Sequence, residues 1–334
     1  MDKLKGLVSI VIVNWNGEKY LKKCIESLLN QSYSDIEIIV VDNDSSDSSI
    51  DIINKNFKDK IKLFLNKNTG YAGGSNKGIE LSKGEFIVIA NPDVVFEKNY
   101  IKKCVAKLVQ DESIAAVTGK LLKYDFDKNK KVNVIDSVGI RLNHRRQGFD
   151  IAQNEFDAGL YEEDKRVFGV CGAAAMFKKD VLEKVKVNNE YFDYDFFAYK
   201  EDIDLCWRIN LYGYKCYYVH DAIAYHGRGM NSSRGIINII KNRKSQSEFL
   251  KGISFRNHYL MILKNETKDS YKKDRIKIYI GFLKYIIFFS LFDWKCLKYI
   301  SQIKKNKESI LRKRHVIQKN IKLSKDEIYQ LFEL

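Results

Sequence analysis

The chain has 334 residues, of which 45% are hydrophobic and 13% aromatic, so it can bury a sizeable core and disorder is not expected. Its net charge of +15 is unevenly placed: residues 241–334 hold 23 Lys and Arg against 9 Asp and Glu, while the other 35 basic and 34 acidic residues nearly cancel. Six cysteines are scattered with no C-x-x-C pair, which argues against a disulfide framework and against a zinc site built from cysteines.

The N-terminal part of the sequence alternates between predicted strands and helices. It opens on Met1-Asp-Lys-Leu-Lys, which leads into a strand without a secretory signal, so we expect a reducing, cytoplasmic location. Strands are predicted at 7–13, 36–41, 61–65 and 86–90. Apolar residues recur at helical spacing after the first strand, at Leu21, Cys24 and Leu28. This alternation predicts an α/β fold with a mostly parallel, doubly wound sheet.

The only proline, Pro92, stands where the apolar strand Phe86 to Ala90 ends in Asn91-Pro-Asp93. Proline lacks an N–H and fixes its own φ, so the chain must leave the sheet there. Ligands of open α/β sheets bind at the carboxyl ends of the strands, and a carboxylate there suits a divalent cation that bridges phosphates. Taken alone, the motif is equally consistent with an ordinary turn at the end of a strand.

Two further polar segments follow predicted strands. Asp42 comes directly after Val40-Val41 and could accept a hydrogen bond from a base or a ribose, whereas Asp44 and Asp47 are better explained as helix caps. The glycine-rich segment Thr69 to Gly78 could let backbone amides approach a diphosphate. It matches neither the Walker pattern nor the dinucleotide fingerprint, and glycines in a turn are the alternative.

Periodicity weakens between residues 120 and 165, which we interpret as hairpins and loops that flank a site. The small-residue segment 167–177 would let a second backbone or a ligand approach closely. A helix is predicted from Glu201 to Gly213, and a strand at 214–219 leads to His226.

The acidic pair Glu201-Asp202 opens the predicted helix among aromatic residues. A carboxylate beside a sugar acceptor could serve as a general base, and the alternative is a solvated helix N-terminus stabilised by the helix dipole. Asp204 could instead pair with Arg208 at i+4. His226, followed by Gly227 and Arg228, could complete a metal or phosphate site, although a single histidine after a strand is usually structural.

Six motifs in order resemble the inverting glycosyltransferases of family 2, specifically the rhamnosyltransferase-like branch. The resemblance covers about residues 6–265 and includes Arg256-Asn257 and Leu263-Lys-Asn265. The motifs are Val8 to Gly17, Val40-Val-Asp42-Asn43-x-Ser45, Asn68-x-Gly70 to Gly78, Asn91-Pro-Asp93, Phe192-Asp to Asp204-Leu, and His226.

The resemblance implies a GT-A fold and a set of site residues. Asp202 would be the base that deprotonates the acceptor hydroxyl, and Asp93 with His226 would bind Mg²⁺ or Mn²⁺. Asn91 replaces the first acid of the D-x-D motif, which implies that metal binding depends on the donor diphosphate. The nucleotide-sugar pocket would be formed by Asn14, Asn16, Asp42, Asn68, Gly70, Gly73, Asn76, Asn91 and Asp93. Contacts to the acceptor or the diphosphate would come from Glu201, Trp207, Arg228 and Arg256.

The basic C-terminal region is predicted to be helical and contains an apolar stretch at 277–294. Lys284 interrupts this stretch, which is shorter than the roughly 20 residues that a membrane-spanning helix needs. With the basic residues that follow, it resembles an interfacial anchor on anionic lipid. The alternatives are a helical cap packed on the catalytic part and, less favoured, a nucleic-acid surface, for which no recognised module is present.

We therefore expect a GT-A catalytic domain at 1–240, with a nucleotide-binding half at about 1–118 and an acceptor-binding half at about 119–240, followed by basic helices at 241–334. The hypothesis is a metal-dependent inverting transferase on the cytoplasmic face of the cell membrane. It would move rhamnose from dTDP-rhamnose to a lipid-linked precursor of a cell-surface polysaccharide, and no nucleic-acid partner is expected. A UDP- or GDP-hexose donor, or a non-catalytic nucleotide-sugar-binding protein, are the alternatives.

Overall fold

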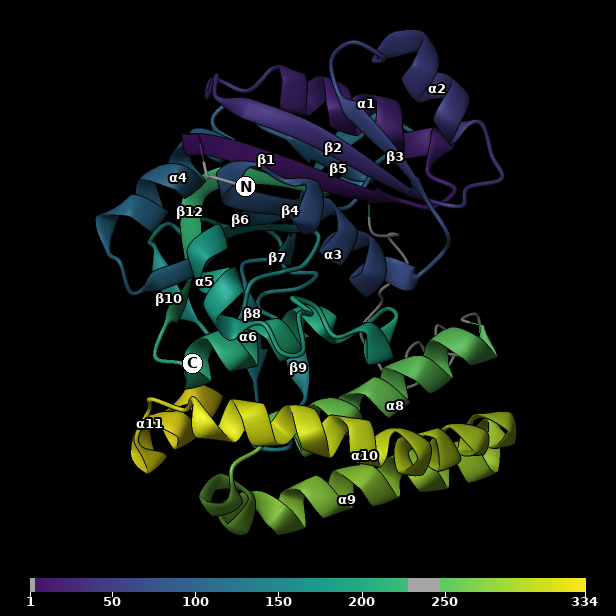
Figure 1. Ribbon diagram of the computed structural model, residues 1–334, viewed down its shortest axis with the longest axis vertical. Coiled ribbons are helices and arrows are strands. Elements are labelled where there is room, and N and C mark those ends of the chain that lie inside the picture. Colours follow the sequence, from purple (N-terminus) through teal and green to yellow (C-terminus); the bar gives the residue numbers. More distant parts are fainter. Residues whose placement is uncertain (1–3, 228–246) are drawn as a thin grey trace.

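A computed structural model describes residues 4–227 and 247–334 (Figure 1). In its first part, four parallel strands lie in the order β3-β2-β1-β4. Their bounds confirm the four strands predicted in this part of the chain. The elements are β1 (Leu4–Asn14), α1 (Glu18–Leu29), β2 (Ile36–Asn43), α2 (Ser49–Asn56), β3 (Lys62–Asn66), α3 (Gly70–Leu81) and β4 (Gly84–Ala90).

The glycine-rich segment is a helix and not the loop predicted from its composition. Helix α3 begins at Gly70, so the glycines lie within its turns. They allow the helix to pack directly on β1: a Cβ on Gly78 would lie 2.1 Å from a methyl of Val11, and one on Gly74 would lie 2.6 Å from a methyl of Val13. Close helix–strand packing therefore explains these glycines.

The second part of the chain makes the sheet mixed. Strand β11 inserts between β4 and β6 and is antiparallel to both, whereas β12 is parallel to β6. Strands β5 and β7 pair with β12 and β6, and a separate hairpin joins β8 to β9. The elements are β5 (Val94–Phe96), α4 (Tyr100–Gln110), β6 (Ile114–Asp125), β7 (Lys130–Ser137), β8 (Ile140–Leu142), β9 (Gly148–Asp150), β10 (Lys165–Val167), β11 (Ala174–Lys178), α5 (Lys179–Val185), η1 (Tyr194–Phe196), α6 (Glu201–Leu211) and β12 (Lys215–His226).

Two hydrophobic clusters cover the two faces of the sheet. Helices α1 and α4 bury their apolar faces on one side, and α3, α5 and α6 pack on the other. The expected α/β class is thus confirmed, with the parallel arrangement limited to part of the sheet. All six cysteines are buried and none forms a disulfide, as expected for small core residues.

The basic C-terminal region forms a layer of helices beneath the sheet domain (Figure 1). Its elements are α8 (Glu248–Asn265), α9 (Lys268–Phe292), η2 (Trp294–Leu297), α10 (Lys298–Lys319), α11 (Lys325–Gln330) and η3 (Leu331–Glu333). Leu260 and Met261 of α8 and Ile310 and Ile317 of α10 belong to the same core cluster as α6, so this part of the layer is a packed cap. Within the described residues, no helix is both long and apolar enough to span a bilayer.

Candidate active site

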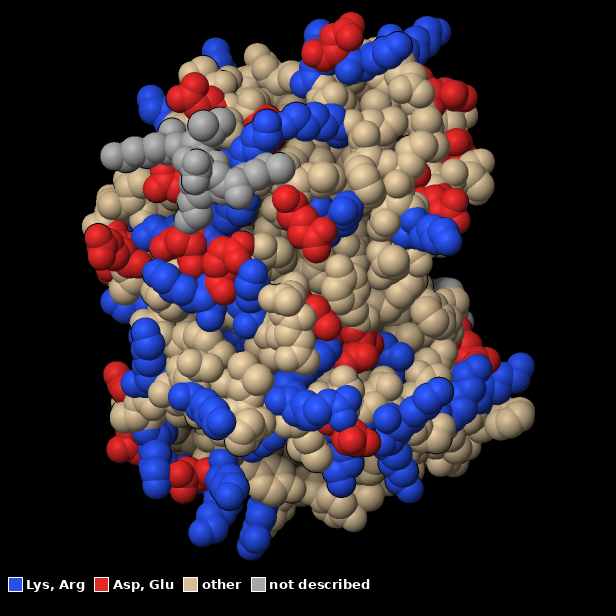
Figure 2. Space-filling model, in the orientation of Figure 1, with Lys and Arg blue, Asp and Glu red and all other residues tan. Residues whose placement is uncertain are grey.

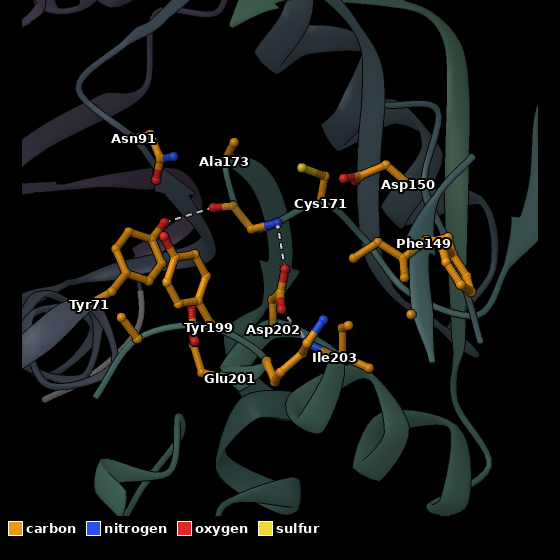
Figure 3. A pocket seen from close by; sticks show the side chains of 15 residues that line it. Tyr71, Asn91, Phe149, Asp150, Cys171, Ala173, Tyr199, Glu201, Asp202 and Ile203 are labelled. Carbon is orange, nitrogen blue, oxygen red and sulfur yellow. Dashed lines mark hydrogen bonds between the residues drawn. The ribbon is translucent and has the colours of Figure 1, made fainter. Parts of the chain in front are cut away.

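A cavity of about 350 Å³ opens between the carboxyl end of β4 and the start of α6 (Figure 3). It lies at the carboxyl edge of the parallel strands, where α/β proteins bind ligands. Its walls come from α3, the β8–β9 hairpin, the segment before β11 and the residues around the N-terminus of α6. The lining residues are Tyr71, Asn91, Ile140, Gly148, Phe149, Asp150, Cys171, Gly172, Ala173, Ala198, Tyr199, Lys200, Glu201, Asp202 and Ile203.

Asp202 lies in this cavity, with its carboxylate held by backbone amides. The N–H of Ile203 donates to Oδ1 at 2.8 Å, and the N–H of Gly172 donates to Oδ2 at 3.3 Å. The carbonyl of Gly172 in turn accepts a hydrogen bond from the hydroxyl of Tyr71 at 2.7 Å, so α3 is linked to the acid (Figure 3). Burial raises the pKa of Asp202 above its ordinary value.

Glu201, the other member of the acidic pair, is only 6% exposed. Its Oε2 has no hydrogen-bond partner within the part of the chain that the structure describes. Burial, reinforced by the negative charge of Asp202, raises the pKa of Glu201 to about 8. The raised pKa favours the protonated form of this carboxyl group, which is a hydrogen-bond donor.

Asn91, Asp93 and His226 meet at the opposite wall of the cavity. Nε2 of His226, the last residue of β12, lies 3.3 Å from Oδ1 of Asp93 and 3.5 Å from Nδ2 of Asn91. The structure therefore brings together Asp93 and His226, the two proposed metal ligands, with Asn91, which was proposed for the nucleotide-sugar pocket. Because Asn91 also lines the cavity, this cluster and Asp202 border the same site.

Asp136 of β7 is a member of this cluster that the sequence analysis missed. Its Oδ2 lies 2.8 Å from Nδ1 of His226, and the whole residue is buried. Burial disfavours a charged imidazole, but the carboxylates of Asp93 and Asp136 outweigh this effect and raise the pKa of His226 to about 9. A single aspartate in a strand of mixed polarity gives no local signal, so only the three-dimensional arrangement identifies it.

The residues proposed for the nucleotide lie at the ends of β1 and β2, and they are strongly hydrogen-bonded to one another. Nδ2 of Asn14 donates to Oδ2 of Asp42 at 2.8 Å, and the N–H of Ser45 donates to Oδ1 at 2.9 Å. Oδ1 of Asn16 accepts from the N–H of Ser46 at 2.8 Å. Asp42 is 1% exposed, so it fixes the loop after β2 in this structure, and its contact with a nucleotide stays a prediction.

The residues proposed along α3 divide between the start of the helix and the protein interior. Asn68 is exposed and accepts a hydrogen bond from the N–H of Gly70 at 3.0 Å, while Gly73 is buried against the side chain of Thr69. Asn76 is buried and makes two hydrogen bonds, of 2.7 and 2.8 Å, to the backbone of Phe192. In this structure the Asn76 amide therefore joins two parts of the core, and its place in the nucleotide-sugar pocket stays a prediction.

Trp207 and Arg256, which were proposed to contact an acceptor or a diphosphate, do not line the cavity in this structure. Trp207 is fully buried and packs edge-on against Phe168 and Phe332. It points into the core because it lies on the inner face of α6. The guanidinium of Arg256 is bound to backbone carbonyls outside the cavity lining, as described below. Arg228 lies outside the described residues.

The buried ion pair predicted between Asp204 and Arg208 is present, with 3.3 Å between Oδ2 of Asp204 and the guanidinium. Lys264 of α8 lies closer to the same oxygen, at 2.8 Å, and Asn265 donates to Oδ1 at 2.7 Å. These contacts tie α6 to α8.

Comparison with known proteins agrees with this geometry. The chain is 34% identical over 125 residues to a Streptococcus pneumoniae protein named glycosyltransferase GlyG, which is 36% of this chain and 41% of that protein. It is 27% identical over 220 residues to a GalNAc(5)-diNAcBac-PP-undecaprenol beta-1,3-glucosyltransferase of Campylobacter jejuni, which is 64% of this chain and 62% of that one. The matches thus span less than two thirds of these relatives.

Two solved structures share the fold. The crystal structure of GalNAc-T7 with UDP, GalNAc and Mn²⁺ has a TM-score of 0.58 and 15% identity, over 77% of this chain and 48% of that one. The crystal structure of S. aureus TarS 1–349 in complex with UDP has a TM-score of 0.53 and 16% identity, over 98% of this chain and 90% of that one. They support the expected GT-A fold. The profile of the family described as "Glycosyl transferase family 2" matches residues 9–186, more than half of the chain, which therefore belongs to glycosyl transferase family 2.

Proposed function

We propose that this protein is an inverting glycosyltransferase that moves a sugar from a nucleotide-diphosphate donor to a hydroxyl group of a glycan. The observation that carries the proposal is the shared cavity: Asp202 lines one wall, and Asn91, in contact with His226 and Asp93, lines the other. A proton acceptor and a candidate metal cluster thus border one site. The sequence resemblance favours dTDP-rhamnose as the donor, whereas a relative named as a glucosyltransferase supports the UDP-hexose alternative.

The proposed reaction is a single displacement. The acceptor oxygen attacks the anomeric carbon of the donor, and Asp202 takes the hydroxyl proton as the new C–O bond forms. The bond between the anomeric carbon and the diphosphate oxygen breaks, and the nucleoside diphosphate leaves with the electron pair. Attack opposite the leaving group inverts the anomeric centre and requires no enzyme nucleophile. In its protonated form, the carboxyl group of Glu201 can donate a hydrogen bond that orients the acceptor or the diphosphate.

The residues beside Asn91 fit a divalent cation whose coordination is completed by the donor. The described residues contain no group of three or more His, Cys, Asp or Glu that could hold an ion alone. The 3.3 Å between Asp93 Oδ1 and His226 Nε2 suits two neighbouring ligands of a small ion, since octahedral ligands at roughly 2.1 Å lie about 3 Å apart. Mg²⁺ is commonly bound by one or two carboxylates together with substrate phosphates. Mg²⁺ or Mn²⁺ held there would stabilise the charge that develops on the diphosphate.

Asp136 completes the support of this cluster. Its hydrogen bond to Nδ1 leaves Nε2 of His226 directed towards Asp93. Carboxylates commonly fix metal-binding histidines in this way.

A panel of nucleotide sugars tests the proposed function. Purified protein with Mn²⁺ or Mg²⁺ is incubated with dTDP-rhamnose, UDP-hexoses or GDP-hexoses, and release of the nucleoside diphosphate is measured with and without lipid-linked glycan acceptors. We expect turnover of one donor class that is stimulated by acceptor and abolished by EDTA. Donor binding without turnover, under all of these conditions, would favour the non-catalytic alternative.

We further propose that the acceptor is lipid-linked and that the protein binds the inner face of the cell membrane through α9. One side of α9 carries a stripe of exposed apolar side chains: Ile276, Tyr279, Ile280, Leu283, Ile287 and Leu291. Each lies three or four residues from another member, so they share one helix face. Trp294, at the start of η2 just beyond the end of α9, is also exposed. Ile287, Leu291 and Trp294 are 58%, 69% and 70% exposed.

Basic residues surround this stripe, as an anionic lipid surface would require. Lys272, Lys273, Arg275, Lys277, Lys284 and Lys295 are exposed on α9 and η2, and Lys and Arg gather over the helical layer in the space-filling view (Figure 2). An apolar stripe flanked by cations matches helices that lie in the plane of a membrane interface. The name of the C. jejuni relative includes an undecaprenol-linked glycan, which supports a lipid-linked acceptor.

Vesicle flotation tests this surface. Full-length protein should bind anionic vesicles more strongly than neutral ones, and salt should weaken the binding. Ile287→Glu with Leu291→Glu should reduce binding about tenfold or more, because each buried aliphatic side chain contributes roughly 1.5–3 kcal/mol. Val109→Glu is the matched control, since Val109 on α4 is equally exposed at 64% but lies away from the stripe. Wild-type binding by the double variant would overturn the assignment of α9.

A further inference from the structure

The segment that leads into the acidic pair has an unusual backbone. Phe197, Tyr199 and Lys200 have φ values of 63°, 70° and 74°, a region that residues with a side chain seldom occupy. Lys200 is the N-cap of α6, so the chain passes directly from this segment to Glu201 and Asp202. Such conformations cost about 1–3 kcal/mol each and persist only where the surroundings hold them.

Helix α8 makes most of the hydrogen bonds that keep this backbone segment in place. The side-chain amide of Asn257 lies 2.7 Å from the carbonyl oxygen of Phe196 and 2.8 Å from those of Ala198 and Tyr199. Asn257 is fully buried, and its Oδ1 accepts hydrogen bonds from Arg256 at 3.0 and 2.9 Å.

Arg256 extends the same contact by one residue. Its guanidinium donates to the carbonyl of Asp195 at 2.7 Å and also approaches that of Phe196, at 3.4 Å. Two consecutive residues of α8 therefore bind the carbonyls on both sides of Phe197.

The remaining carbonyl, that of Phe197, accepts a hydrogen bond from the N–H of Ala72 in α3 at 3.0 Å. Gly70 makes this contact possible, because it has a φ of +74° and a Cβ there would lie 2.3 Å from the same oxygen. All five carbonyls from 195 to 199 are thus bound by residues distant in sequence. The segment is held between α8 and α3, whose residue Tyr71 lines the cavity.

We propose that Arg256 and Asn257 are positioning residues, which fix the backbone of 195–200 so that Glu201 and Asp202 face the cavity. Both lie beyond residue 186, where the family match ends, and neither lines the cavity. Helix α8 is then part of the catalytic apparatus and not only a support for a membrane-binding layer. This inference rests on the proposed function, because it gives Asp202 the role of base.

Asn257→Ala removes the central contact. We expect kcat to fall about 10- to 100-fold, as for small misplacements of a catalytic group, while KM for the donor stays within about twofold. Amide hydrogen exchange in 195–203 should rise selectively. Arg256→Ala, which keeps Asn257, should change the same quantities in the same direction but less, and it provides a folded variant if Asn257→Ala is unstable.

Leu260→Ala is the matched control for destabilisation. Leu260 is fully buried on the same helix, one turn away, and its aliphatic side chain cannot donate a hydrogen bond to these carbonyls. Its loss should lower Tm, as large-to-small core substitutions do, while kcat stays close to that of the wild type. Asn257→Gln retains the amide and should recover part of the lost kcat.

The two arms of the experiment separate the possible failures. If Asn257→Ala and Arg256→Ala keep wild-type kcat, or if they raise only KM for the donor, the positioning role is wrong; the second result would indicate a diphosphate contact for Arg256. If the wild type turns over no donor, the proposed function fails. Hydrogen exchange then still decides whether α8 holds the segment, because an unchanged exchange rate in Asn257→Ala would overturn that as well.

Discussion

The two walls of the cavity are built in different ways. Asn91 and Asp93 follow a central strand directly, and Pro92 forces the chain out of the sheet at that point, so a short stretch of sequence largely determines where they lie. Asp202, on the other wall, is held by the amide of Gly172 and follows a backbone segment that α3 and α8 hold from a distance. We call the side formed by Asn91 and Asp93 the strand wall and the side formed by Asp202 the helix wall. Substitutions far from the cavity should therefore have little effect on the position of the strand wall, whereas they should displace the helix wall.

Substitution of Asp202 should give the largest effect. Asp202→Asn removes the proposed base while keeping the shape of the side chain, so we expect kcat to fall about 10²- to 10⁴-fold with little change in donor KM. Asp150→Asn is the matched control, since Asp150 lines the same cavity; it should retain kcat within several-fold. Equal kcat losses in both variants would mean that the base has been assigned to the wrong carboxylate.

The strand wall is tested at Asp93. Asp93→Asn removes one charged group beside His226. We expect kcat to fall about 10²- to 10³-fold, which is typical of losing one group that stabilises the charge developing on the leaving diphosphate. The Mn²⁺ concentration needed for half-maximal activity should also increase. Asp136→Asn, which alters the hydrogen bond to Nδ1 of His226, should lower metal affinity about 10- to 100-fold. A metal dependence unchanged in both variants would separate this cluster from any cation.

The same contrast explains what could be predicted from the sequence. The four parallel strands and the Asn91-Pro-Asp93 turn were predictable because apolar runs and a single proline are local signals. The helical state of the segment from Gly70 was not, since Gly74 and Gly78 serve to pack α3 on β1. A sequence motif can indicate that a glycine is required at a position without indicating whether it serves ligand binding or helix packing.

Asn76 and Asp136 illustrate what a pattern of residue types leaves out. Asn76 belongs to a recognisable motif, but the motif does not predict that its amide binds the backbone of Phe192 in the core. Asp136 belongs to no motif, yet it orients His226 across a sequence separation of 90 residues. Both depend on tertiary contacts that a pattern of residue types does not encode.

Gly172 offers a milder test of the helix wall. A Cβ at this position would lie 3.2 Å from both Cβ and Oδ2 of Asp202, so Gly172→Ala should displace the acid by a few tenths of an ångström. We expect kcat to fall about tenfold with Tm nearly unchanged. Gly281→Ala, where the added methyl group meets open space, is the control and should keep wild-type kcat. Unchanged kcat in Gly172→Ala would show that this wall adapts more readily than the comparison suggests.

The last prediction concerns Glu201 and the dependence of stability, not activity, on pH. Burial and the charge of Asp202 raise the pKa of Glu201 to about 8 in the folded protein, against an ordinary value of 4.5. Between these values the folded protein keeps a proton that the unfolded chain releases. The free energy of unfolding should therefore decrease as pH rises through 4.5 to 8, by at most about 1.4 kcal/mol per pH unit, and level off above 8. Glu201→Gln carries no such proton, so wild type should lose stability relative to this variant between pH 4.5 and 8.

Thermal unfolding at several pH values measures the difference in stability between wild type and Glu201→Gln, with Glu163→Gln at an exposed position as control. Parallel curves for wild type and Glu201→Gln would mean that water or a cation reaches Glu201, and that this wall is more open than its burial indicates.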